Sequence, residues 1–177
     1  MDEMIREEER IVEERSNEAS WVEEAMLDRP IRELPTLRLP SCVSQSTSLR
    51  QAIDRMAAEK IGCVLVVDGD RLVGVFTERD VLTKVVDRPL DLERIPVEQL
   101  MTREPECLSP DEPMAYALNK MTVGGFRHVP LVDAEGRPAG LVSMRDIVEY
   151  IVDLFPRSVL TLPPSTELSI SRTREGA

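Results

Sequence analysis

The spacing of apolar residues predicts a helix, two strands and a second helix in the first half of the chain. Five apolar residues share the three- and four-residue spacing of one buried helix face: Leu49, Ala52, Ile53, Met56 and Ala57. Ser48 and Gln51 lie where a capping box would start that helix. Continuous apolar runs at 61–67 and 72–76 predict two buried strands, joined by a hairpin turn at 68–70. The last helix is predicted from Val81, Leu82, Val85 and Val86.

The same pattern occurs a second time, about 65 residues further along. Four pairs of segments match: 30–36 with 96–102, 40–56 with 105–121, 63–68 with 128–133 and, after one inserted residue, 71–81 with 137–147. The second copy repeats the buried helix face at Met114, Ala117, Leu118 and Met121, and the last helix at Ile147, Val148, Ile151 and Val152. Its strands are expected at 126–132 and 139–143. Short extended pieces at Cys42–Ser44 and Cys107–Ser109 precede the first helices, so each unit is β-α-β-β-α.

A unit of roughly 60 residues buries only about 60% of its unfolded surface and is marginally stable alone. We therefore predict an α+β fold in which the two βαββα units pack sheet to sheet across a pseudo-twofold axis. The predicted boundaries are 30–90 for the first motif, 91–95 for a linker and 96–155 for the second motif. Clefts between two such units are places where small molecules tend to bind.

The segments that flank the repeats differ from them in composition. Residues 1–29 are rich in Glu and Arg, which predicts an acidic N-terminal helical arm. Residues 156–177 contain Pro156, Pro163 and Pro164 among Ser and Thr residues, which predicts an extended or disordered tail. Either segment is a candidate surface for a protein partner, and a solvated surface helix is the alternative interpretation of the arm.

Composition excludes several classes of function. The formal net charge of −11 and an aromatic content of 3% disfavour nucleic-acid binding. Three cysteines without a CxxC pair and a single histidine disfavour a disulfide framework and a zinc site. No apolar run approaches the roughly 18 residues of a membrane span, and the charged N-terminus does not resemble a signal peptide. We therefore expect no membrane association and a cytoplasmic location.

The candidate chemistry lies in a tetrapeptide that each repeat carries between its last strand and its last helix. These tetrapeptides are Thr77-Glu78-Arg79-Asp80 and Ser143-Met144-Arg145-Asp146. A hydroxyl followed three residues later by an acid is also the pattern of an ordinary helix cap. In the functional interpretation the carboxylate accepts hydrogen bonds from ribose hydroxyls, while the hydroxyl and the arginine hold a phosphate. The two roles are compatible.

The middle strand of each repeat supplies the second part of the candidate site. In the second repeat the strand residues are Phe126, Arg127, His128, Val129 and Pro130, and in the first repeat they include Cys63 and Val64. Aliphatic side chains here would form walls for a flat base. The alternatives are a solvated surface for Arg127, a polar strand residue for His128 and core packing for Cys63.

Both repeats resemble CBS motifs, and the pair resembles a Bateman module over roughly residues 30–155. The second repeat carries the family's Gly-hydrophobic-x-x-hydrophobic-Pro stretch as Gly125, Phe126, Val129 and Pro130, followed by Ser143 and Asp146. The first repeat matches through Thr77 and Asp80, but has Lys60 and Leu65 where the family has glycine and proline. The complete pattern of the second repeat predicts that Asp146 contributes more to binding than Asp80.

The resemblance implies a regulatory, energy-sensing module that binds AMP, ADP, ATP or S-adenosylmethionine between its repeats, forms homodimers and has no catalytic cofactor. No nucleophile–base pair is evident, so we expect no enzymatic activity. The alternative is a ligand-free dimerisation or scaffold module with vestigial clefts. The predicted ligand-binding residues are Cys63, Val64, Thr77, Arg79, Asp80, Phe126, Arg127, His128, Val129, Pro130, Ser143, Arg145 and Asp146.

Overall fold

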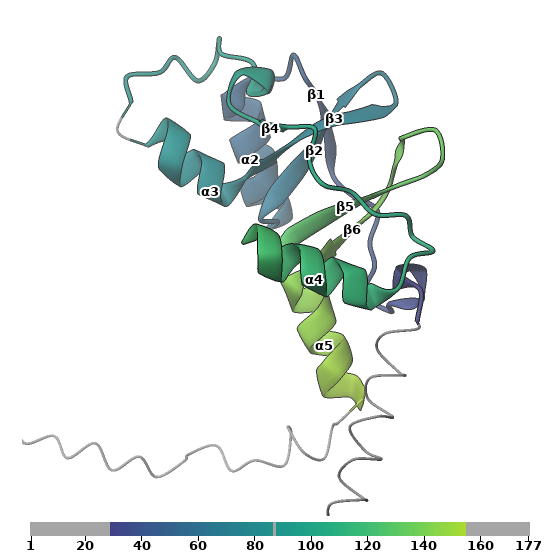
Figure 1. Ribbon diagram of the computed structural model, residues 1–177. Coiled ribbons are helices and arrows are strands. Elements are labelled where there is room, and N and C mark those ends of the chain that lie inside the picture. Colours follow the sequence, from purple (N-terminus) through teal and green to yellow (C-terminus); the bar gives the residue numbers. More distant parts are fainter. Residues whose placement is uncertain (1–28, 87, 155–177) are drawn as a thin grey trace, which may run out of the picture.

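A computed structural model of the chain describes residues 29–86 and 88–154. The predicted tail lies outside the described residues, as does the predicted N-terminal arm up to residue 28. The described residues form the predicted α+β fold of two repeats (Figure 1).

The elements of the two repeats follow a similar order, except that β4 lies before the position that matches β1. The first repeat contains η1 (Ile31–Glu33), β1 (Cys42–Ser44), α2 (Leu49–Glu59), β2 (Cys63–Asp68), β3 (Arg71–Thr77), α3 (Glu78–Asp80) and η2 (Val81–Val85). The second contains η3 (Val97–Gln99), β4 (Thr102–Arg103), α4 (Met114–Gly124), β5 (His128–Val132), β6 (Pro138–Ser143) and α5 (Met144–Leu154). The predicted capping box is present at the start of α2, where the Ser48 and Gln51 side chains each accept a hydrogen bond from the other's backbone N–H.

The strands form two sheets that lie between the helices. One sheet has the order β1-β2-β3-β4, with β1 parallel to β2 and the other neighbours antiparallel. The other sheet is the antiparallel pair β5-β6. Figure 1 shows the strands of both repeats in the middle of the molecule, with α2 and α3 beyond the first sheet and α4 and α5 beyond the second.

The segment that leads into each repeat packs on the other repeat. We call residues 29–38 the first leader and residues 92–103 the second leader. Ile31 and Leu34 of the first leader are buried in the core of the second repeat. Val97 and Met101 of the second leader are buried in the core of the first repeat. Each repeat therefore completes its core with side chains from the leader that precedes its partner in the chain.

Backbone hydrogen bonds show the same exchange. The Ile31 N–H donates to the Glu112 carbonyl over 2.9 Å, and the matching Val97 N–H donates to the Thr47 carbonyl over 2.8 Å. At the end of the second leader, β4 pairs with β3 of the first repeat. At the end of the first leader, Arg38 forms a bridge with Leu141 in β6.

Three predictions about local structure differ from the observed fold. The extended piece expected at Cys107–Ser109 is a single bridge between Leu108 and Leu131, because the preceding β4 takes the edge of the sheet of the first repeat. Leu82 is exposed and Val86 is largely exposed, because the predicted last helix is a short α-helical turn followed by the π-helical η2. Ala57 is exposed, so the buried face of α2 consists of Leu49, Ala52 and Met56.

Gly74 gives a direct test of the packing of the second leader. A methyl group at Gly74 would lie 2.3 Å from Met101 Sδ, whereas one at the matching Gly140 would lie 3.1 Å from Leu131 Cδ1. We predict that Gly74→Ala lowers the free energy of unfolding by about 1–3 kcal/mol through overpacking, and that Gly140→Ala lowers it less. Urea denaturation of both variants measures this, and a larger loss of stability in Gly140→Ala than in Gly74→Ala would contradict the observed packing.

Candidate functional site

Both tetrapeptides are helix caps in the structure. Thr77 precedes α3, and its Oγ1 accepts a hydrogen bond from the Asp80 N–H over 3.2 Å. In return Asp80 Oδ2 accepts hydrogen bonds from the Thr77 N–H and hydroxyl over 2.9 and 2.7 Å. Ser143 and Asp146 repeat this arrangement, with Asp146 Oδ2 accepting over 2.7 and 2.6 Å. The capping interpretation therefore applies to both repeats, and it fixes the orientation of each carboxylate.

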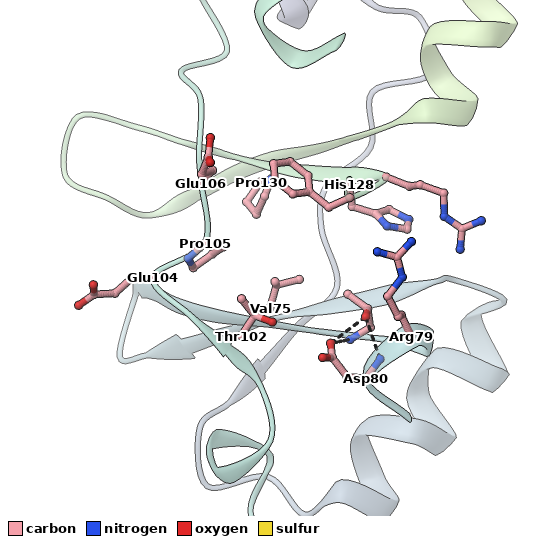
Figure 2. A pocket seen from close by; sticks show the side chains of 12 residues that line it. Val75, Arg79, Asp80, Thr102, Glu104, Pro105, Glu106, His128 and Pro130 are labelled. Carbon is pink, nitrogen blue, oxygen red and sulfur yellow. Dashed lines mark hydrogen bonds between the residues drawn. The ribbon is translucent and has the colours of Figure 1, made fainter. Parts of the chain in front are cut away.

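A cavity of about 340 Å³ lies between the two repeats, on the side of Asp80. This volume falls within the usual range for small-molecule pockets. Its lining consists of Val75, Thr77, Arg79, Asp80, Thr102, Glu104, Pro105, Glu106, Phe126, Arg127, His128 and Pro130. Figure 2 shows side chains from both repeats facing one another across this space. The cavity is therefore a composite of the two repeats.

The structure divides the predicted binding residues into two groups. Seven of them line the cavity: Thr77, Arg79, Asp80, Phe126, Arg127, His128 and Pro130. Cys63, Val64 and Val129 are buried side chains and do not line it. Ser143, Arg145 and Asp146 also lie outside its lining. The tetrapeptide of the first repeat thus meets residues of the middle strand of the second repeat across the interface.

Pleat geometry explains which strand residues reach the cavity. Successive side chains of a strand point to opposite faces, so His128 and Pro130 face the cavity while Val129 is buried in the core of the second repeat. Cys63 matches His128 in the sequence repeat, yet it is only 1% exposed. Burial raises the pKa of the Cys63 thiol to about 12, and the nearby Glu78 carboxylate adds to this effect. These properties agree with core packing and not with a reactive thiol.

Sequence reasoning missed five lining residues. Val75 belongs to β3, and Thr102, Glu104, Pro105 and Glu106 follow one another from the second leader onward. The match between 30–36 and 96–102 marks equivalent leaders, but it includes only Thr102 among these five residues. The sequence does not indicate that each leader crosses to the other repeat, so their position beside Asp80 was not evident.

Charged groups are distributed unevenly along the cavity. Arg79 and His128 point toward each other from opposite repeats at one end, while Glu104 and Glu106 lie at the other end (Figure 2). Arg79 also donates from Nη1 to the carbonyl of Gly125 over 2.8 Å, which links the two repeats. Glu106 is paired with Lys120 at 2.7 Å. The end near Arg79 is thus suited to an anionic group.

His128 is partly shielded from water within this arrangement. Burial lowers its pKa below the ordinary value of 6.5, and the nearby Arg127 guanidinium lowers it further. The carboxylates of Glu78 and Asp146 oppose this shift without overcoming it. His128 is therefore mainly neutral at pH 7 and offers one hydrogen-bond donor and one acceptor.

Across residues 29–86 and 88–154, no group of three or more His, Cys, Asp or Glu side chains is placed to hold a metal ion. In the same part of the chain, no helix combines the length and apolar character needed to cross a membrane.

Comparison with known proteins identifies the family. The family model of the CBS domain matches residues 22–87 and 97–153, which correspond to the two repeats. The chain belongs to the CBS domain family, and its fold is that of a CBS domain pair.

Individual relatives are similar over the paired repeats. A CBS domain-containing protein of Arabidopsis thaliana, CBSCBSPB5, is 36% identical over 116 residues, which cover 65% of this chain but only 20% of that protein. The structure of a CBS domain protein from Pyrobaculum aerophilum complexed with AMP is 26% identical and has a TM-score of 0.63, with 72% of this chain and 99% of that chain covered. A CBS domain pair in complex with 5-methylthioadenosine and S-adenosyl-L-methionine is 25% identical, with a TM-score of 0.60 and coverages of 70% and 99%.

The environment of His128 predicts a pH dependence of stability. Because the folded-state pKa is lowered, the unfolded chain binds the proton more readily, and protonation favours unfolding. The contribution of neutral His128 to the free energy of unfolding is fully present above the pKa of about 6.5 that histidine has in the unfolded chain. This contribution is lost progressively as the pH falls toward the lower pKa of the folded state. We predict that the stability advantage of the wild type over His128→Gln is smaller at pH 5.5 than at pH 7.5.

Urea denaturation at the two pH values measures this difference. Since His128 is the only histidine in the chain, its NMR titration in the folded protein gives an independent value. A folded-state pKa above 6.5 would contradict the described environment.

Proposed function

We propose that the chain is a regulatory module that binds an adenine nucleotide in the cavity between its repeats. The single observation that carries this proposal is the composite cavity, in which Asp80 of the first repeat and Phe126, His128 and Pro130 of the second line the same space. Relatives of the same fold that are complexed with AMP, or with S-adenosylmethionine and methylthioadenosine, support an adenosine-containing ligand.

Each part of an adenine nucleotide has complementary groups in the cavity. Val75, Pro105 and Pro130 offer apolar surfaces on which a flat base can pack. Asp80 offers a carboxylate to a ribose hydroxyl, which makes a charge-assisted hydrogen bond. Arg79 and Arg127 offer guanidinium groups to a phosphate. We assign no catalytic step to these residues, because each has a role in binding alone.

The regulatory part of the proposal follows from the composite lining. A ligand that contacts both repeats stabilises the arrangement in which the cavity is closed, and the shift can be no larger than the difference between its affinities for the two arrangements. We propose that a homodimer of this cytoplasmic module, or a protein partner that contacts the arm or the tail, responds to that shift. The boundaries that the sequence predicts for the arm, the two motifs, the linker and the tail are part of the same proposal.

The matched acids of the two repeats give the sharpest test of the site. Asp80 and Asp146 cap equivalent helices, so alanine removes the same capping contact at both positions. Only Asp80 lines the cavity. We predict that Asp80→Ala weakens AMP binding by about 1.5–3 kcal/mol, the usual contribution of a hydrogen bond to a charged group, and that Asp146→Ala has little effect.

Isothermal titration calorimetry with AMP on both variants measures these affinities. This order is the reverse of the one expected from the sequence pattern. A larger loss for Asp146→Ala would place the ligand outside the cavity described above.

A thermal-shift panel separates nucleotide binding from the ligand-free scaffold. A ligand at about 100 times its dissociation constant adds about 2.7 kcal/mol to the stability of the folded state. We predict that at least one of AMP, ADP, ATP and S-adenosylmethionine raises the melting temperature of the wild type, and that the increase is reduced in Asp80→Ala. If none of the four has an effect, the scaffold function is favoured.

A further inference from the structure

The acids of the two tetrapeptides differ in how many of their oxygens are already bonded. Both acids accept two hydrogen bonds on Oδ2 from the residue three positions earlier. In addition, Asp80 Oδ1 forms an ion pair with Lys84 Nζ at a distance of 2.7 Å. For Asp146, the bonds within the described part of the chain use Oδ2 alone. The residue that matches Lys84 in the second repeat is Tyr150, which is buried and carries no positive charge.

The extra bond changes what the Asp80 carboxylate can recognise. An ionised carboxylate has about four acceptor positions, two on each oxygen. Thr77 occupies both positions on Oδ2 and Lys84 occupies one on Oδ1, which leaves a single position for a ligand. Asp80 is therefore able to accept one ribose hydroxyl, whereas an acid without the lysine is able to accept both.

The lysine is held at a second point, so a ligand does not displace it easily. Lys84 Nζ donates to the carbonyl oxygen of Leu100 over 2.7 Å. Leu100 lies in the second leader, which contributes Thr102 to the cavity wall and is followed by Glu104. Displacing Lys84 would break two charge-assisted hydrogen bonds at once. The side chains involved are also shielded, since Asp80 is 10% and Lys84 33% exposed.

We propose that Lys84 is a positioning residue that restricts Asp80 to one hydroxyl of the ribose, so that the site distinguishes the 2′-hydroxyl from the 3′-hydroxyl. This inference rests on the proposed function, because it requires an adenine nucleotide in the cavity. It goes beyond that function by assigning a specificity to a residue outside the cavity lining.

The test compares AMP with 2′-deoxyAMP and 3′-deoxyAMP by calorimetry on the full chain. For the wild type, we expect one deoxy analogue to bind within about threefold of AMP and the other to bind at least about tenfold more weakly, as expected for one lost hydrogen bond to a charged group. Lys84→Met keeps an unbranched side chain that is one atom shorter and removes its charge. In this variant Oδ1 has two free positions, so we expect both analogues to bind at least about tenfold more weakly than AMP.

Arg50→Met is the matched control, because it removes one positive charge from an exposed ion pair on α2 outside the cavity. It should keep the wild-type pattern. The ratio of analogue to AMP affinity is the readout, since a general loss of stability or of phosphate attraction affects all three nucleotides alike. If Lys84→Met does not fold, an equal loss of affinity for both deoxy analogues in the wild type still contradicts the role of Lys84.

The outcomes separate this inference from the proposed function. If AMP binds to the wild type and both deoxy analogues bind more weakly than AMP by the same factor, the proposed role of Lys84 is contradicted. The proposed nucleotide site is not contradicted by that result. The role is also wrong if Lys84→Met keeps the wild-type ratios. If none of the three nucleotides binds to the wild type, the proposed function itself fails.

Discussion

Neither repeat closes its own hydrophobic core, and the rest of the structure depends on this constraint. Ile31 and Leu34 complete the core of the second repeat, while Val97 and Met101 complete the core of the first. Burial of a large aliphatic side chain contributes about 1.5–3 kcal/mol, and a unit of this size is marginally stable alone. The exchange of leaders therefore ties the stability of each repeat to the presence of the other.

The cavity is a consequence of the same exchange. Because the second leader packs on the first repeat and the chain then returns to the second, the chain passes along the interface and contributes Thr102 of the leader and the following Glu104 to the cavity wall. Arg79 of the first repeat crosses the interface in the opposite direction and donates a hydrogen bond to the Gly125 carbonyl of the second repeat. A ligand in this space contacts groups whose relative positions depend on the packing of both repeats, which links binding to the arrangement of the domain pair.

The two sides of the interface are related by sequence but are not equivalent. His128 is partly exposed to the cavity, while its counterpart Cys63 is fully buried. Arg79 reaches the opposite repeat, while Arg145 pairs with Glu149 on its own helix. Lys84 holds Asp80, and the matching Tyr150 is a buried aromatic residue. The internal duplication thus preserved the fold while the side chains at the interface diverged.

Local elements were largely predictable from the sequence, and long-range pairings were not. The spacing of Leu49, Ala52 and Met56 specifies a buried helix face, and Ser48 specifies its start, because both depend on neighbours within a few residues. The apolar character of Ile31 and Met101 predicts that both side chains are buried. It does not indicate which of the two repeats buries them, and this choice decides where each leader packs. For that reason seven of the lining residues were predictable from local motifs, whereas Thr102, Glu104, Pro105 and Glu106 were not. The π-helical η2 had no signal in the spacing of Leu82 and Val86.

The most direct test of the composite site is a crystal structure of the protein with bound AMP. The account predicts that the ribose lies beside Asp80 of the first repeat and that the base or the phosphate contacts residues of the Phe126–Pro130 strand of the second. Electron density for the nucleotide beside Ser143 and Asp146, with the cavity on the side of Asp80 empty, would contradict it.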